Sequence, residues 1–284
     1  MDTRKIILGS AQFGNKYGIT NLKKTKIREI GKIISYSKSK GIKIIDTAQD
    51  YGKSEKILGK INIKDFKIVT KIKFDKKKQN IEKLICNSKK NLKKNKIYGV
   101  LFHSSKSLLG KYGIQLFDEI IKLKKRKLIN KIGISIYSPN EFFELKKRGF
   151  KFDIIQIPLS IFDKRFLKND ILRKIKKTGS EIHARSIFLQ GLLLQEKKDI
   201  PSQFKKWEKS WNNWNYFILK NKFKKTNACI NFVLQNKYIN KIIIGISSLK
   251  DIKEIFRNYK KINIKKLNKD FTNDIRLIDP RLWK

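Results

Sequence analysis

The 284-residue sequence is poor in cysteine, histidine and proline, with two, two and four residues of each. Cys86 and Cys229 are too few for a disulfide framework, and no spacing of Cys and His suits a metal site. Long hydrophobic runs are also missing, since every apolar stretch stops well short of the roughly 20 residues that a membrane span requires. The first residues, MDTRKIILGSAQFG, lack an apolar segment of secretory type. We therefore expect a cytoplasmic protein with no membrane attachment.

Acidic residues are scarce as well, because 24 Asp and Glu stand against 69 Lys and Arg, which gives a formal net charge of +45. Such a balance is typical of proteins that bind nucleic acid or anionic surfaces. The basic residues are nevertheless spread along the whole chain in short pairs and triples, such as KKK at 76–78 and KKRK at 124–127. Aromatic residues do not interleave with them in a stacking motif. We interpret the charge mainly as solvated helix faces, with a basic nucleic-acid-binding protein as an alternative.

What the chain does contain is a regular alternation of two patterns. Near-continuous apolar runs rich in Ile and Val predict eight buried parallel strands, at residues 5–11, 43–48, 66–72, 97–103, 131–136, 152–158, 181–187 and 241–247. Apolar residues three and four apart predict helices between and after them, at 27–38, 81–92, 114–126, 166–177 and 249–256. Eight strands that alternate with helices, in a chain of this length, are typical of a (β/α)8 TIM barrel. No linker divides the chain, so we expect a single barrel domain over residues 1–284.

Polar residues lie at the ends of three consecutive predicted strands. Asp46, Lys71 and His103 end the second, third and fourth strands, and Tyr51 follows the second. Reactive groups of such barrels lie at the carboxyl ends of the strands, so these four residues should converge on one rim. An alternative interpretation of Asp46 and Lys71, if they are considered without the other two residues, is a structural ion pair.

The chemistry of these four residues is coherent. A nearby ammonium lowers the pKa of a phenol, so Lys71 could make Tyr51 a better general acid, while Asp46 would pair with Lys71. His103 could donate a hydrogen bond to a carbonyl oxygen beside the phenol. The set suits protonation of a carbonyl oxygen while a hydride arrives at the carbon.

The stretch IIDTAQDYGKSEKILG at 44–59 resembles the aldo-keto reductase pattern DTAxxYGxSExxLG, and further similarity covers nearly the entire chain. The resemblance implies that Asp46, Tyr51, Lys71 and His103 are catalytic. It also implies a nicotinamide cofactor that is bound without a Rossmann domain, and no GxGxxG motif lies on a strand–helix junction. The cofactor contacts that it implies come from Ser135, Gln156, Arg185, Ser186, Gly245, Ser247 and Ser248.

The sequence gives conflicting indications of whether NADPH or NADH is the preferred cofactor. Ser247, Ser248 and the amides that begin the helix at 249–256 could receive the 2′-phosphate of NADPH, with added charge from Lys250 or Lys253. Asp251, in contrast, stands where the resemblance leads us to expect an arginine. The positive field of the whole chain favours the more anionic cofactor. We expect use of both cofactors, with a modest preference for NADPH over NADH.

Several residues have simpler interpretations. His183, Cys86 and Cys229 are expected in the core, and the aromatic stripe Trp207, Trp211 and Trp214 predicts an inserted helix packed on the barrel, although one indole could line the substrate pocket. Arg185 replaces an aromatic residue that many family members stack on the nicotinamide.

The sequence thus predicts an NAD(P)H-dependent oxidoreductase that reduces an aldehyde or ketone to an alcohol. The end of the chain, LIDPRLW, resembles short bacterial-type members, which suggests a sugar derivative as substrate. A cofactor-binding regulatory subunit without turnover remains a second alternative. No sequence feature indicates an oligomeric state.

Overall fold

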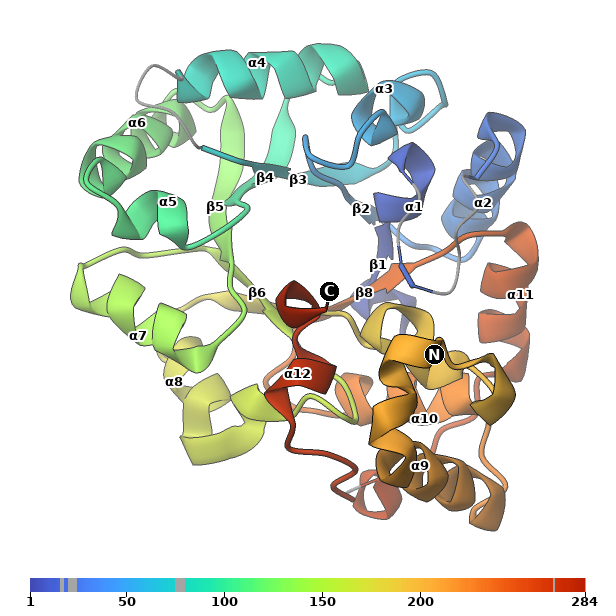
Figure 1. Cartoon of the computed structure of the whole chain (residues 1–284). Coiled ribbons are helices and arrows are strands. Elements are labelled where there is room, and N and C mark those ends of the chain that lie inside the picture. The colour runs from blue at the N-terminus through green and yellow to red at the C-terminus, as the bar shows by residue number, and fades with distance from the viewer. Residues whose placement is uncertain (16–17, 20–24, 75–79, 268, 284) are drawn as a thin grey trace.

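A computed structural model describes residues 1–15, 18–19, 25–74, 80–267 and 269–283, so the KKK run at 76–78 lies outside the described residues. Within them, parallel strands pair in chain order and the last pairs with the first, which closes a barrel (Figure 1). The strands are β1 (Ile6–Gly9), β2 (Ile44–Asp46), β3 (Lys67–Ile72), β4 (Ile97–Phe102), β5 (Ile129–Ser135), β6 (Ile154–Pro158), β7 (Glu181–Arg185) and β8 (Lys241–Gly245). The predicted TIM barrel is confirmed, and each strand overlaps its predicted run.

Helices surround the barrel (Figure 1). The α-helices are α1 (Ala11–Gly14), α2 (Ile27–Ser39), α3 (Ser54–Leu58), α4 (Ile81–Leu92), α5 (Lys106–Leu109), α6 (Gly113–Lys125), α7 (Pro139–Lys147), α8 (Ile171–Lys176), α9 (Glu208–Lys220), α10 (Lys225–Leu234), α11 (Leu249–Asn258) and α12 (Ile275–Ile278). Short 3-10 helices are η1 (Thr3–Lys5), η2 (Arg165–Asp170), η3 (Leu189–Leu194), η4 (Lys197–Asp199), η5 (Ser202–Trp207), η6 (Ile264–Leu267) and η7 (Pro280–Leu282). In the described residues, no helix is long and apolar enough to cross a membrane.

The barrel interior is filled by a layer of apolar side chains from six strands. This layer is separate from the larger core between sheet and helices, and it consists of Ile7, Ile44, Val69, Leu101, Ile154 and Ile243. Side chains alternate between the two faces of a strand, so the residue two positions further on also points inward. Those next positions are Gly9, Asp46, Lys71, His103, Gln156 and Gly245. The period of the strands therefore places four polar groups and two glycines one step above the apolar layer, at the mouth of the barrel.

Two helix-level expectations need correction. The predicted helix at 166–177 is divided into η2 and α8, because Asn169 and Asp170 adopt left-handed conformations with φ of 52° and 58°. Asn and Asp tolerate this conformation better than most residues, so the chain bends there even though the apolar spacing continues. Cys86 is exposed on α4, whereas Cys229 is buried on α10 as expected.

The tryptophan stripe lies on η5 and α9, within the long connection between β7 and β8. Trp211 and Trp214 are buried, and their indole nitrogens donate to the carbonyl oxygens of Phe204 and Leu193. Trp207 donates to Asp274 at 2.9 Å. None of the three lines the cavity described below, and Trp211 and Trp214 pack in the main hydrophobic core, as predicted for an inserted helix.

Candidate active site

Lys71 is the centre of a buried polar cluster at the barrel mouth. Its ammonium lies 2.5 Å from Asp46 Oδ1 and 3.4 Å from the hydroxyl of Tyr51, and it also donates to the Thr47 carbonyl at 3.1 Å. The side chains of Lys71 and Asp46 are only 1% and 3% exposed. Gln156 Nε2 donates to the second carboxylate oxygen of Asp46 at 2.6 Å. The charges of this ion pair are therefore compensated inside the protein, and Lys71 is fixed in position beside the phenol.

The ionisation of Tyr51 differs from the expectation that Lys71 lowers its pKa. Burial raises the pKa of Tyr51 far above its usual value, and the nearby Asp46 carboxylate raises it further, whereas the Arg185 guanidinium acts in the opposite direction. Desolvation penalises the charged phenolate, and the charge of Lys71 is already balanced by Asp46. Tyr51 is consequently a neutral phenol with a proton to give at every physiological pH.

His103 lies directly after β4, with its ring 6.0 Å from that of Tyr51 in an edge-to-face arrangement. Burial lowers its pKa to about 3, and the charges of Lys71 and Arg185 lower it further. The Asp50 carboxylate lies 3.5 Å from Nδ1, at the outer limit of a hydrogen bond. The imidazole is therefore neutral above pH 4 and carries a single N–H, which a ligand can receive when it is on Nε2 and not directed at Asp50.

The turn that carries Tyr51 is held by side chains of the same sequence motif. Ser54 Oγ lies 2.9 Å from Ser10 Oγ and 3.2 Å from Thr47 Oγ1, so it links the ends of β1 and β2 to the start of α3. Glu55, also buried, accepts a hydrogen bond from Thr70 on β3 at 2.7 Å. Most of the motif therefore positions Tyr51 and does not itself face the barrel mouth.

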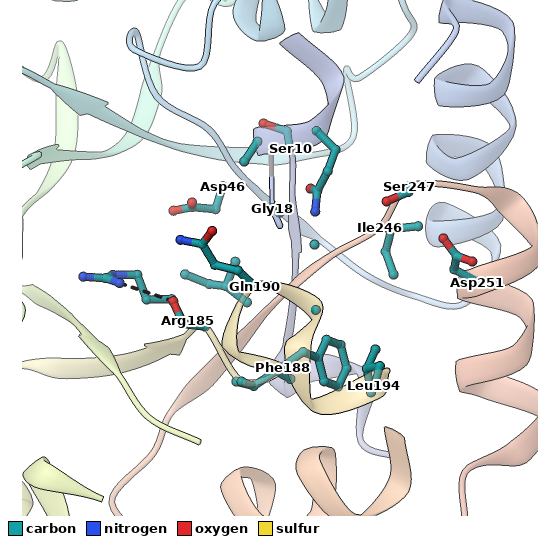
Figure 2. A pocket seen from close by; sticks show the side chains of 18 of the residues that line it. Ser10, Gly18, Asp46, Arg185, Phe188, Gln190, Leu194, Ile246, Ser247 and Asp251 are labelled. Atoms are coloured by element: carbon teal, nitrogen blue, oxygen red, sulfur yellow. Dashed lines mark hydrogen bonds between the residues drawn. The ribbon is translucent and has the colours of Figure 1, made fainter. Parts of the chain in front are cut away.

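A cavity of about 360 Å³ opens beside this cluster. It lies between the residues that follow β1, β7 and β8, and Asp46 and Tyr51 form part of its wall. Figure 2 shows Asp46 and Arg185 on one side of the cavity and Ser247 and Asp251 on the other. Its size is in the range typical of small-molecule and cofactor sites.

The wall of this cavity formed after β7 has a strained backbone. Ser186, Leu189 and Gln190 have positive φ angles of 58°, 48° and 53°. Such conformations are costly for residues other than glycine, and they cluster at ligand-binding segments. Ile19 N donates to the carbonyl of Gln190 at 3.4 Å, so a residue from the loop after β1 contacts this wall.

The expected cofactor residues fall into two groups. Arg185, Ser186, Gly245 and Ser247 line the cavity, whereas Ser135, Gln156 and Ser248 do not. Ser135 and Gln156 pair on neighbouring strands, and Ser135 accepts a hydrogen bond from Arg185 Nε at 3.2 Å. Ser248 instead caps α11, since its hydroxyl accepts from Asp251 N at 3.1 Å.

Arg185 fixes one side of the barrel mouth. Its guanidinium donates to the Ile136 carbonyl at 3.1 Å and lies 4.0 Å from the ring centre of Tyr137. Arg281 lies on the same ring at 4.3 Å, so Tyr137 is in contact with two guanidinium groups. Arg185 is therefore held by β5 and by the residues that follow it.

Two residues of this region escaped sequence reasoning. Gln12 lines the cavity, and its Oε1 is buried with no hydrogen-bond partner among the described residues. Glu29, on α2, accepts a hydrogen bond from Leu249 N at 2.6 Å. Neither residue carried a sequence signal, because each depends on contacts between distant parts of the chain.

A cofactor with amide and hydroxyl groups fits these surroundings. Gln12 Oε1 can accept a hydrogen bond at the cavity wall, whereas Gln156, whose Oε1 is also buried without a partner in the described part of the chain, does not line the cavity. Buried polar atoms are normally satisfied, so the orphaned acceptor of Gln12 favours a polar ligand.

Comparisons with known proteins agree with the fold. The model of the Aldo/keto reductase family matches residues 5–279. The holo form of an aldo-keto reductase from Bacillus halodurans has a TM-score of 0.71 and 18% identity, over 93% of this chain and 92% of that chain. A Pseudomonas aeruginosa protein described as an aldo-keto reductase has a TM-score of 0.65 and 18% identity, over 89% of this chain and 90% of that chain. A search of curated proteins gave no significant match.

Proposed function

The chain belongs to the aldo/keto reductase family, and we propose that it reduces an aldehyde or ketone to the alcohol, with Tyr51 as general acid. Family and fold imply reduction of a carbonyl compound with a nicotinamide cofactor. The observation that carries the assignment to Tyr51 is the buried Lys71, which lies between Asp46 and the Tyr51 hydroxyl beside the cavity.

Each residue of the cluster has a separate role in this mechanism. A reduced nicotinamide held by the cavity residues would supply a hydride for the carbonyl carbon. Tyr51 gives its proton to the oxygen, on which negative charge develops, and the Lys71 ammonium at 3.4 Å partly offsets the cost of the buried phenolate that remains. Asp46 keeps Lys71 in place. Neutral His103 donates its N–H to the same carbonyl oxygen and orients it toward Tyr51.

The cavity residues bind the cofactor in this proposal. Arg185, Ser186, Gly245 and Ser247 contact it from the wall, and Ser248 fixes the start of α11. Ser135 and Gln156 do not line the cavity and are assigned to the carboxamide end of the cofactor on the family resemblance alone. Both NADPH and NADH serve as reductant. A sugar derivative is the proposed substrate class, on the likeness of residues 277–283 to short bacterial-type members.

Substitution of Tyr51 by phenylalanine tests the mechanism. Tyr51→Phe should leave cofactor binding nearly unchanged and lower turnover by about 10²–10⁴-fold, the usual contribution of general acid catalysis. Turnover is followed by cofactor absorbance across a panel of aldehydes and ketones. Because Tyr51 stays protonated, the wild-type rate should not rise as the pH falls from 8 to 6.

The matched control is Tyr216→Phe, which removes the same hydroxyl from an exposed position on α9 and should keep the wild-type rate. Wild-type turnover in Tyr51→Phe would remove Tyr51 from the mechanism. If the wild-type protein binds cofactor and does not oxidise it in a single turnover with any carbonyl compound, the regulatory-subunit alternative is favoured.

A further inference from the structure

The N-terminal turn of α11 forms the end of the cavity that lies away from Tyr51. Ser247 and Asp251 line this end, and Asp46 and Arg185 line the other (Figure 2). A dinucleotide whose nicotinamide reacts beside Tyr51 must place its adenosine ribose toward Ser247 and Asp251. This step rests on the proposed function.

Protein acceptors already use two of the amides that begin α11. Leu249 N donates to the Glu29 carboxylate at 2.6 Å, and Asp251 N donates to the Ser248 hydroxyl at 3.1 Å. Free amides at a helix N-terminus attract anions, and a carboxylate bound there supplies the negative charge that a phosphate would bring. Glu29, from α2, does not line the cavity, but its carboxylate already accepts from the Leu249 amide, so this amide is not free for an added phosphate group.

The lysines closest in sequence do not compensate for these acids. The Lys250 side chain is 82% exposed and lies 4.0 Å from Glu254, one turn along the same helix. Lys253 lies over the ring of Tyr36 at 6.0 Å. Neither residue lines the cavity, whereas Asp251 does. Among the described residues that line it, Arg185 carries the positive charge, and it stands at the opposite end.

We propose that Asp251 and Glu29 make this protein select NADH over NADPH. A carboxylate at the N-terminal turn of α11 can accept a hydrogen bond from the 2′-hydroxyl of the adenosine ribose in NADH. The same carboxylate repels the phosphate that NADPH carries on its 2′-oxygen. The sequence alone suggested the opposite order, because Ser247, Ser248, Lys250 or Lys253 and the positive field of the whole chain were expected to favour the 2′-phosphate. The geometry of α11 leaves a 2′-phosphate next to the Asp251 carboxylate, with the Leu249 amide already used by Glu29 and with no cation at this end from the described residues that line the cavity.

The test is the ratio of two dissociation constants at physiological salt. Fluorescence titration should give NADH an affinity about tenfold higher than that of NADPH, which corresponds to one close like-charge contact of about 1.4 kcal/mol. Calorimetric titration with ADP and 2′,5′-ADP should give the same order without any turnover. Asp251→Asn and Glu29→Gln should each move the ratio toward one, because each keeps the shape of the side chain and removes its charge.

Glu254→Gln is the matched control, because it removes an equal charge from the same helix at a residue that does not line the cavity. It should leave the ratio unchanged within twofold. Equal or tighter binding of NADPH by the wild-type protein would overturn the inference while leaving the proposed reductase function intact. A ratio that neither Asp251→Asn nor Glu29→Gln changes would also overturn it. Failure to bind either dinucleotide would overturn both.

Discussion

Asp46 shows how one carboxylate can link stability to chemistry. It accepts hydrogen bonds from Lys71 and Gln156, and its side chain is 3% exposed. Asp46→Asn leaves the Lys71 ammonium buried without its counter-charge. Removal of one partner of a buried pair typically costs about 3–5 kcal/mol, so the free energy of unfolding, measured in urea, should fall by that amount.

The double variant Asp46→Asn with Lys71→Met separates the charge effect from simple loss of packing. With both charges gone, no ion remains buried, and most of the lost stability should return. If the double variant is as unstable as Asp46→Asn alone, the charge pair is not the cause.

The residues that sequence reasoning found and those it missed differ in a physical way. Asp46 and Lys71 were found as polar residues at the ends of predicted strands, and Gln156 was found through the family resemblance. The period of two along the strands explains why all three side chains point into the barrel mouth. Cys86 was wrongly placed in the core because it follows the buried Ile85, although one residue along a helix turns the side chain by about 100°. Glu29 depends on how α2 packs beside α11, which no local pattern encodes.

The contact between α1 and α3 decides where Tyr51 lies. A side-chain carbon added at Gly14 would stand 1.7 Å from the carbonyl oxygen of Tyr51 and 2.4 Å from Ser54 N. Gly14→Ala must therefore displace the turn at residues 51–54. We expect a loss of about 1–3 kcal/mol in unfolding free energy, as for other overpacked sites, together with a lower turnover number.

The control for this substitution is Gly31→Ala on α2. A side-chain carbon there meets nothing within 4 Å, and alanine in a helix interior should stabilise by about 0.5–1 kcal/mol. Thermal unfolding and turnover are measured for both variants. Wild-type stability and turnover in Gly14→Ala would show that the turn can yield without moving Tyr51.

Strands and helices were predicted best where both faces of the element are buried, because the sequence then shows a continuous apolar run. The eight strands carry continuous apolar runs because helices cover the outside and side chains fill the inside. The break between η2 and α8 was missed because Asn169 and Asp170 interrupt the helix through their backbone conformation, while the apolar spacing around them continues. The strained loop after β7 was also missed, because no spacing of apolar residues in the sequence indicates its backbone conformation.

Part of the positive charge has a regular arrangement on the molecule. Basic residues occupy the last turns of α2, α4, α6, α7 and α8, including Lys38, Lys90, Lys125, Lys147 and Lys176. Cations there are stabilised by the negative ends of the helix dipoles. In a barrel of alternating strands and helices, helix C-termini lie beside strand N-termini, which is the face opposite the barrel mouth. The sequence indicated solvated helix faces, but it could not show that these helix-end lysines and arginines form a basic face on the side opposite the cavity.

This arrangement predicts how nucleic acid affects cofactor binding. A random DNA duplex should bind weakly at low salt, and its affinity should fall steeply as salt rises, because the attraction comes from counterion release. The basic face and the cavity are separated by strands of five to seven residues in β3–β8, or about 17–23 Å at about 3.3 Å per residue, which exceeds the Debye length of about 8 Å at physiological salt. Saturating DNA should therefore leave the dissociation constant of NADH unchanged. Charge that only covers solvated helix ends cannot distinguish one DNA sequence from another. Tight binding of one DNA sequence at physiological salt would therefore contradict this account and favour a nucleic-acid-binding role. Displacement of NADH by DNA would contradict it as well.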